Sequence, residues 1–163
     1  MDRQLRFEDD LVSLLPRLRR FAHALSRSSA DADDLTQATV ERAIRSRDQW
    51  IPGTRLDSWL YRIMRNLWID TARSRSRKAK FEAAPEEAAK VGADGATEAS
   101  AELARVMAAM QQLPDEQREV VSLILVEGFG YREAAELLEL PIGTISSRLV
   151  RGRTALLALI GER

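Results

Sequence analysis

The sequence predicts an all-α protein made of two small helical domains joined by a flexible linker. Apolar residues recur at three- and four-residue steps, which is the period of an amphipathic helix. Glycine and proline are scarce, at 8 and 5 residues, so few breaks interrupt this pattern. Residues 1–80 carry 17 Lys and Arg against 11 Asp and Glu, whereas residues 81–163 carry 8 against 14. A basic half and an acidic half indicate two modules with different tasks, although the net charge is zero.

The first domain, expected over residues 1–80, begins with an apolar helical face that ends in a serine-rich stretch. This face consists of Leu11, Leu14, Leu15, Leu18, Phe21, Ala22 and Leu25. We expect Asp31 to cap a second helix, because a short acceptor side chain can bind the free N–H groups of a first turn. The residues on or near the buried side of this second helix are Leu35, Ala38, Thr39 and Ile44.

A short loop at Pro52 and Gly53 separates the second helix from a long third one. The third helix is expected from about Thr54, because Thr54 and Asp57 are spaced as in a capping box. Its inner face holds Leu56, Trp59, Leu60, Ile63 and Leu67. The three segments together predict a small helical bundle.

A linker is expected over residues 81–99, which are rich in Ala and Glu and show no sustained apolar face. The second domain, residues 100–163, starts with a helix whose apolar face is formed by Leu103, Val106, Met107 and Met110. The next helix follows Pro114 and ends at Gly128 and Gly130. A short helix from Tyr131 to Leu138 and a last helix from about Gly143 to Ile160 complete the domain.

Two helices joined by a short turn within residues 130–157 predict a helix-turn-helix. Ala134 and Ala135 are small enough to let these helices approach closely, and Thr144 is placed to cap the second of them. Between its apolar positions the second helix presents hydroxyls and guanidinium groups, which can bind phosphates and base edges. These residues are Ser146, Ser147, Arg148, Arg151 and Arg153. A plain helical hairpin with a solvated basic face is the alternative.

Residues 47–78 interleave three tryptophans and a tyrosine with arginines. Aromatic rings can stack unpaired bases while arginine holds the phosphates, as a protein that traps a melted strand requires. Trp50, beside the loop, is the candidate for stacking. Trp59 is in phase with Leu56 and Ile63, so we expect it to be a core residue.

These stretches, in this order, resemble the extracytoplasmic-function (ECF) sigma factors of the sigma-70 family over nearly the whole chain. DADDLTQATVERAI (31–44) is similar to the family's polymerase-binding helix, and WLYRIMRNLWIDTAR (59–73) to its −10 element region. Residues 113–156 resemble its −35 element domain. The segments LPDEQREVV and EGFGYREAAE also look like the alphaproteobacterial general-stress subgroup.

The resemblance implies three sets of site residues. The polymerase-binding set is Asp33, Asp34, Leu35, Gln37, Glu41 and Arg42. The set expected to bind −10 DNA is Trp50, Thr54, Arg55, Arg62, Arg65, Asn66, Arg73 and Arg75. The set expected to bind −35 DNA is Thr144, Ser146, Ser147, Arg148, Val150, Arg151 and Arg153. No catalytic residue, metal site or cofactor is expected.

The family's partners are implied in the same way. They are core RNA polymerase, through the clamp helices of the largest subunit and the flap of the second-largest subunit, promoter DNA, and an anti-sigma factor that holds the protein inactive. The free protein is expected to be a monomer without membrane contact. Its mechanism would be bridging: the first module captures the melted −10 strand, and the second holds duplex −35 DNA.

The chain departs from the family pattern at three places. The loop has IPGT where more polar residues are usual, which puts the −10 base preference in doubt. Ser146 stands where a basic residue is common. Glu139 replaces a usual turn glycine, which is tolerable at negative φ and otherwise costs strain of about 1 kcal/mol.

Several other classes of protein are disfavoured. The chain has no cysteine, which excludes disulfides and thiolate metal sites, and its charged first ten residues do not resemble a secretory signal, so we expect a cytoplasmic protein. An enzyme is disfavoured because His23 is the only histidine and no phosphate-binding glycine loop is present. A stand-alone dimeric helix-turn-helix regulator remains the alternative, although it leaves residues 31–78 without a task.

Overall fold

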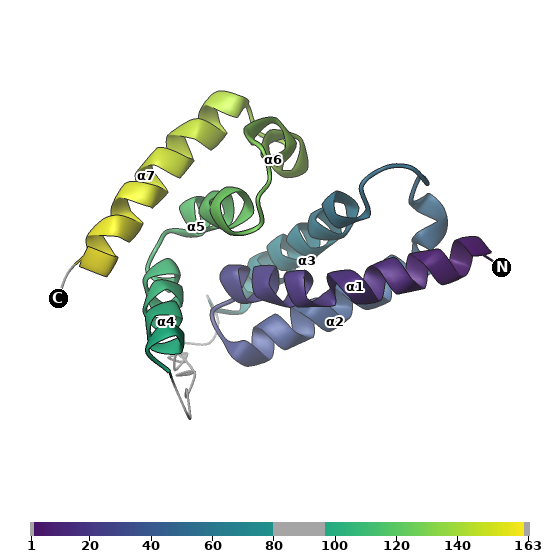
Figure 1. Cartoon of the computed structure of the whole chain (residues 1–163), viewed down its shortest axis with the longest axis horizontal. Coiled ribbons are helices and arrows are strands. Elements are labelled where there is room, and N and C mark those ends of the chain that lie inside the picture. The colour runs from purple at the N-terminus through teal and green to yellow at the C-terminus, as the bar shows by residue number, and fades with distance from the viewer. Residues whose placement is uncertain (1, 80–96, 162–163) are drawn as a thin grey trace. The chain divides into compact units, whose positions relative to one another are not determined.

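The computed structural model describes residues 2–79 and 97–161, and every regular element in these two stretches is a helix (Figure 1). This confirms the all-α prediction. The chain divides into two compact units, residues 1–88 and 89–163. Most of the expected linker, residues 81–99, lies outside the described residues, and its last two residues already belong to a helix that begins at Glu98.

The first unit is a bundle of α1 (Asp2–Leu25), α2 (Ser29–Arg45) and α3 (Leu56–Ala79), each packed against the other two (Figure 1). A short 3-10 helix, η1 (Arg47–Gln49), follows α2. Phe21 of α1 and Tyr61 of α3 are fully buried, and their rings meet edge to face at 4.8 Å. The fully buried aliphatic residues around this pair include Leu18, Leu25, Leu60 and Met64.

Both expected helix caps of this unit are wrong. Ser28 caps α2: it is extended, at φ −133° and ψ 156°, and its hydroxyl accepts the Asp31 N–H at 3.1 Å. Asp31 is therefore the third residue of α2, and its carboxylate is available to another partner. At α3 the Thr54 hydroxyl donates to the Ile51 carbonyl, so Thr54 shapes the loop and does not form a capping box.

The second unit contains α4 (Glu98–Gln111), α5 (Asp115–Val121), α6 (Tyr131–Leu138) and α7 (Ile142–Gly161), and α7 packs against the other three. The bounds expected for α6 are confirmed. The helix expected after Pro114 changes at Ser122 into a π-helix, η2 (Ser122–Val126), in which Glu127 N–H donates to the Ser122 carbonyl at 2.9 Å. Thr144 does not cap α7 but is its third residue, and its N–H donates to the Pro141 carbonyl.

Replacing Glu139 by glycine is expected to stabilise the second unit by about 0.5–1 kcal/mol. Glu139 ends α6 at φ 55°, in the left-handed region, and the Leu140 N–H donates back to the Ala135 carbonyl at 3.0 Å. Glycine adopts this conformation without a Cβ clash, although it also gains entropy in the unfolded chain. Urea unfolding of Glu139→Gly measures the gain. Glu139→Ala, which removes the charge but keeps the strained φ, should show no gain.

Candidate functional site

The solvent face of α7 is the first candidate surface. Ser147, Val150, Arg151 and Arg153 are exposed on it, while Ile145 and Leu149 are buried beneath. Thr144 and Ser146 are half-buried. Arg148 is also partly covered, and its guanidinium lies 3.7 Å from the Glu116 carboxylate of α5. The predicted −35 residues thus share one helix, but they differ in how freely they can reach a ligand.

The seat of α7 on α5 depends on Gly152, which the sequence analysis did not single out. Gly152 is buried among exposed arginines, and a Cβ built on it would lie 2.7 Å from Val121 Cγ2 and 3.2 Å from Gln117 Cβ. The two helices can therefore approach this closely only because position 152 has no side chain. The sequence contained one sign of this close packing: a glycine between two arginines inside a predicted helix, where glycine is otherwise unfavourable.

The loop between α2 and α3 is the second candidate surface. Ile51 to Arg55 are all exposed, and Gly53 has a φ of +88°. Trp50 and Trp59, at the two ends of this region, are both half-buried. Both contact the Phe7 ring of α1: the ring centroids are 5.8 Å apart for Phe7 and Trp50 and 6.2 Å apart for Phe7 and Trp59.

The arginines predicted to bind −10 DNA follow α3 and the loop before it. Arg62, Arg73 and Arg75 are exposed, as is Asn66, while Arg65 is half-buried. Arg75 donates two hydrogen bonds to the Asp31 carboxylate of α2, at 2.7 and 2.5 Å.

Arg55, also predicted to bind −10 DNA, donates to the Asp57 carboxylate at 3.1 and 2.8 Å. Burial pushes the pKa of the Asp57 carboxyl up, but the Arg55 and Ser58 hydrogen bonds and the charges of Arg55 and Arg17 outweigh burial, so the pKa lies below its ordinary value. Asp57 is therefore a carboxylate at neutral pH, and a DNA phosphate would have to compete with it for Arg55.

Acidification below about pH 3.8 is expected to remove the stabilisation by Asp31 and Arg75. The hydrogen bonds from Arg75 hold the pKa of the Asp31 carboxyl below its ordinary value of 3.8. A carboxyl with a lowered folded-state pKa stabilises the fold above its unfolded pKa and loses this contribution as the pH falls through the folded value. Since both side chains are partly exposed, the contribution is at most about 1 kcal/mol.

The measurement is the difference in unfolding free energy between neutral pH and about pH 3. Arg75→Gln should reduce this difference. Arg77→Gln, at another exposed arginine of the same helix, should leave it as in the unsubstituted protein. An equal difference in all three proteins would show that the ion pair does not contribute in solution.

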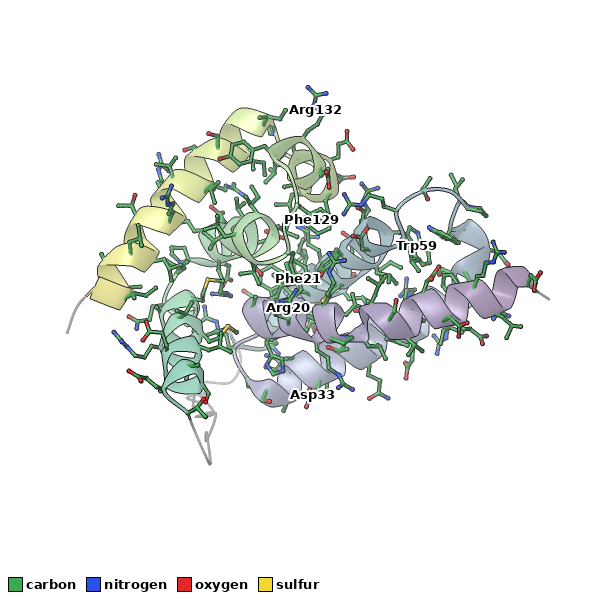
Figure 2. All side chains as sticks on the ribbon, viewed as in Figure 1. Arg20, Phe21, Asp33, Trp59, Phe129 and Arg132 are labelled. Atoms are coloured by element: carbon green, nitrogen blue, oxygen red, sulfur yellow. The ribbon has the colours of Figure 1, made fainter. Side chains whose placement is uncertain are left out.

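The third candidate surface is α2. The polar members of the predicted polymerase-binding set are exposed on it, and Figure 2 shows Asp33 on the outside of the helix. Gln37 donates to the Glu41 carboxylate at 3.3 Å across one turn. Leu35 differs from the rest of the predicted set, since it is only 8% exposed and packs into the bundle. The exposed members are Asp33, Asp34, Gln37, Glu41 and Arg42.

Residues 2–79 and 97–161 bring together no group of three or more His, Asp or Glu side chains that could hold a metal ion. Among the helices described, none combines the length and the apolar character that a membrane span requires.

Comparison with known proteins covers both units. Residues 11–78 match the model of Sigma-70 region 2, and residues 103–156 match that of Sigma-70, region 4. The chain is 38% identical over 152 residues to the ECF RNA polymerase sigma factor EcfG of Rhodopseudomonas palustris. The aligned segment covers 93% of this chain and 83% of EcfG.

Solved structures are also similar to this chain over nearly its whole length. The sigma factor RpoE of Bartonella quintana, crystallised with the anti-sigma factor NepR, matches with a TM-score of 0.87 and 34% identity over 97% of this chain and 99% of that one. CnrH in complex with the cytosolic domain of CnrY matches with a TM-score of 0.70 and 27% identity, over 96% and 88% of the two chains.

Proposed function

Since the chain belongs to the ECF sigma factors of the sigma-70 family, we propose that its two units read the two promoter elements through the surfaces described above. As an alternative sigma factor, the protein binds core RNA polymerase and directs promoter-specific transcription initiation. We assign polymerase binding and −10 recognition to residues 1–80, the connection to residues 81–99, and −35 recognition to residues 100–163.

The observation that carries this proposal is the exposed face of α7. Val150 is 61% exposed, Arg151 next to it in the sequence is exposed, and Arg148 is partly covered. Ile145 and Leu149 are buried and anchor the helix in the unit. A helix with this arrangement can enter a major groove, where arginine binds guanine and an apolar group contacts the thymine methyl. The −35 set is therefore Thr144, Ser146, Ser147, Arg148, Val150, Arg151 and Arg153.

The first unit takes the other two tasks in this proposal. The exposed acidic and polar side chains of α2 bind the clamp helices of the polymerase, and Leu35 supports them from within the bundle. Trp50, the exposed loop and the arginines of α3 hold the melted −10 strand. Arg55 and Arg75 exchange their carboxylate partners for phosphates when the strand arrives. The −10 set is Trp50, Thr54, Arg55, Arg62, Arg65, Asn66, Arg73 and Arg75.

We further propose that an anti-sigma factor regulates the protein. The similar sigma factor RpoE was co-crystallised with the anti-sigma factor NepR, and the similar structure of CnrH was solved in complex with the cytosolic domain of CnrY. The similarity to EcfG and RpoE favours the general-stress subgroup. The same proposal includes a cytoplasmic monomer that takes no part in catalysis and contacts the polymerase flap through its second unit.

The test is run-off transcription with core RNA polymerase on a fragmented genomic library, followed by mapping of the 5′ ends, with and without this protein. The proposal expects new start sites that share −35 and −10 elements at a constant spacing. No stimulation of the core, together with a dimer that shifts duplex DNA by itself, would favour the helix-turn-helix regulator instead.

Arg151→Ala and Arg153→Ala are each expected to weaken binding of the mapped −35 duplex. A bidentate contact to a base is worth about 1–3 kcal/mol, or roughly 5- to 150-fold in affinity, and its loss relaxes the preference at one base pair. Loss of a phosphate contact weakens all sequences equally and reduces the salt slope by about one. Fluorescence anisotropy at several salt concentrations separates the two roles. Arg105→Ala, on α4, is the control and should leave both quantities nearly unchanged.

A further inference from the structure

We infer that Phe7 is a positioning residue for −10 recognition: it holds the loop between α2 and α3 in its reading conformation through Trp50 and Trp59. The inference rests on the proposed function. Phe7 lies in the second turn of α1, outside the segment 11–78 that matches Sigma-70 region 2, and it is only 4% exposed.

One ring of α1 contacts both tryptophans. The Phe7 and Trp50 ring centroids are 5.8 Å apart at an interplanar angle of 48°, and the Phe7 and Trp59 centroids are 6.2 Å apart at 69°. Trp50 enters the loop, and Trp59 lies in the first turn of α3 after it. Phe7 therefore links both ends of the loop to a third element, at distances typical of favourable tilted and edge-to-face pairs.

Two backbone hydrogen bonds within the loop are local. Trp50 N–H donates to the Arg47 carbonyl at 3.2 Å, and Thr54 N–H donates to the Ile51 carbonyl at 3.2 Å. These two bonds shape the turns but do not orient the loop on the bundle. At its far end the loop reaches α1 through Arg55 and Asp57, whose carboxylate also accepts from Arg17 at 3.3 Å, whereas the Trp50 end reaches α1 through Phe7. Besides the Phe7 contact, the Arg47 guanidinium lies 3.9 Å from the Glu8 carboxylate, so the same turn of α1 also contacts η1, directly before Trp50.

The indole N–H of Trp50 also indicates that packing, and not a hydrogen bond, holds this side chain. Its Nε1 atom is buried and has no hydrogen-bond acceptor among the residues that the structure describes. A buried donor without an acceptor is unfavourable, so a hydrogen bond is not what keeps the ring in this position. Ring packing on Phe7 is the aromatic contact that favours this position.

A fixed loop matters for selection of a base. A loop that is already ordered loses less conformational entropy when the strand binds. A rigid pocket also excludes bases that do not fit its shape. Without the Phe7 ring, the loop can adapt to different bases. The expected consequence is a loss of −10 discrimination more than a loss of overall transcription.

Phe21 provides a matched control. It is also a buried phenylalanine of α1, and its ring meets Tyr61 edge to face at 4.8 Å. It lies fourteen residues further along the helix, which corresponds to about 21 Å. Phe21→Leu therefore removes a comparable aromatic contact from the same helix without touching the loop.

The experiment compares Phe7→Leu with Phe21→Leu in the full chain, assembled with core polymerase. The template is a promoter mapped for the unsubstituted protein, with either its −10 or its −35 element randomised, and the transcripts are counted by sequence. Phe7→Leu is expected to reduce the preference for the best over the worst −10 base by about fivefold or more, with −35 preference and core affinity within about twofold. Phe21→Leu lowers total transcripts and keeps the −10 preference.

A double-substitution cycle tests the route through the tryptophan. If Phe7 acts by holding Trp50, adding Phe7→Leu to Trp50→Leu changes the −10 preference little further, whereas independent effects would multiply. Phe7→Met fills similar space without a ring and replaces Phe7→Leu if that variant folds poorly.

Unchanged −10 preference in Phe7→Leu, equal loss in Phe21→Leu, or multiplicative effects in the cycle would each overturn the inference. Failure of the unsubstituted holoenzyme to select any −10 sequence would overturn the proposed function itself, and the inference with it.

Discussion

Gly152→Val is expected to destabilise the second unit by about 3 kcal/mol and to abolish −35 binding by the full-length protein. The first added carbon would lie 2.7 Å from Val121 Cγ2, and Val121 is only 1% exposed. Because Val121 is held in the core, it cannot move aside, and α7 must lift from α5. Valine is the better test than alanine, since alanine regains about 1 kcal/mol of helix propensity that would mask part of the clash.

Hydrogen exchange of peptides from α5 and α7 measures this effect, because it reports on the second unit within the intact chain. The matched control is Gly161→Val, at the end of the same helix, where an added Cβ meets nothing within 4 Å. It should leave exchange in α5 nearly unchanged. Native-like exchange in Gly152→Val would show that α5 and α7 are not packed as closely in solution.

Arg118→Ala is expected to cost about 2–4 kcal/mol of stability in the second unit. Arg118 is 1% exposed, and its guanidinium donates to the Leu113 carbonyl at 3.0 Å and to the Asp115 carboxylate at 2.7 Å. Truncation leaves a cavity and removes a partner from the Leu113 carbonyl. The side chain therefore ties the turn between α4 and α5 to the core that supports α7.

Two further variants separate the contributions of side-chain volume, hydrogen bonds and the ion pair to this loss of stability. Arg118→Met retains most of the volume and loses the hydrogen bonds, so about 1–3 kcal/mol is expected. Asp115→Ala removes only a half-exposed carboxylate and should cost no more than about 1 kcal/mol. Urea unfolding ranks the three proteins. An Asp115→Ala loss as large as that of Arg118→Ala would mean that the ion pair, and not burial of the arginine, provides the stability.

The sequence was most informative where structure depends on local pattern. The bounds of α6 follow from the glycines before it and the turn residues after it, and the exposure of Arg151 and Arg153 on α7 follows from helical period. The caps were less predictable, because several residues near a helix end can accept the same N–H groups. Ser28 took the position expected for Asp31, and Asp31 became the partner of Arg75.

The expected roles of individual side chains depended on packing between segments. Trp50 was expected to stack a base because it is beside the loop, and Trp59 was expected in the core because of its helical phase. Both nevertheless lie against Phe7 of a distant helix. Leu103 was expected on an apolar face and is 62% exposed. Periodicity identifies a face but does not show which of its residues a neighbouring helix covers.

By itself the sequence determined the helical class, the order of the two units and the presence of a basic face on the last helix, because period, charge and breaker residues are properties of the chain. Only the tertiary structure decided that Gly152 seats α7, that Arg118 is buried, that Glu139 has a positive φ and that Phe7 contacts both tryptophans. Each of these depends on distances between atoms far apart in sequence or on a backbone angle imposed by the packing of its neighbours, and residue type and spacing contain neither quantity.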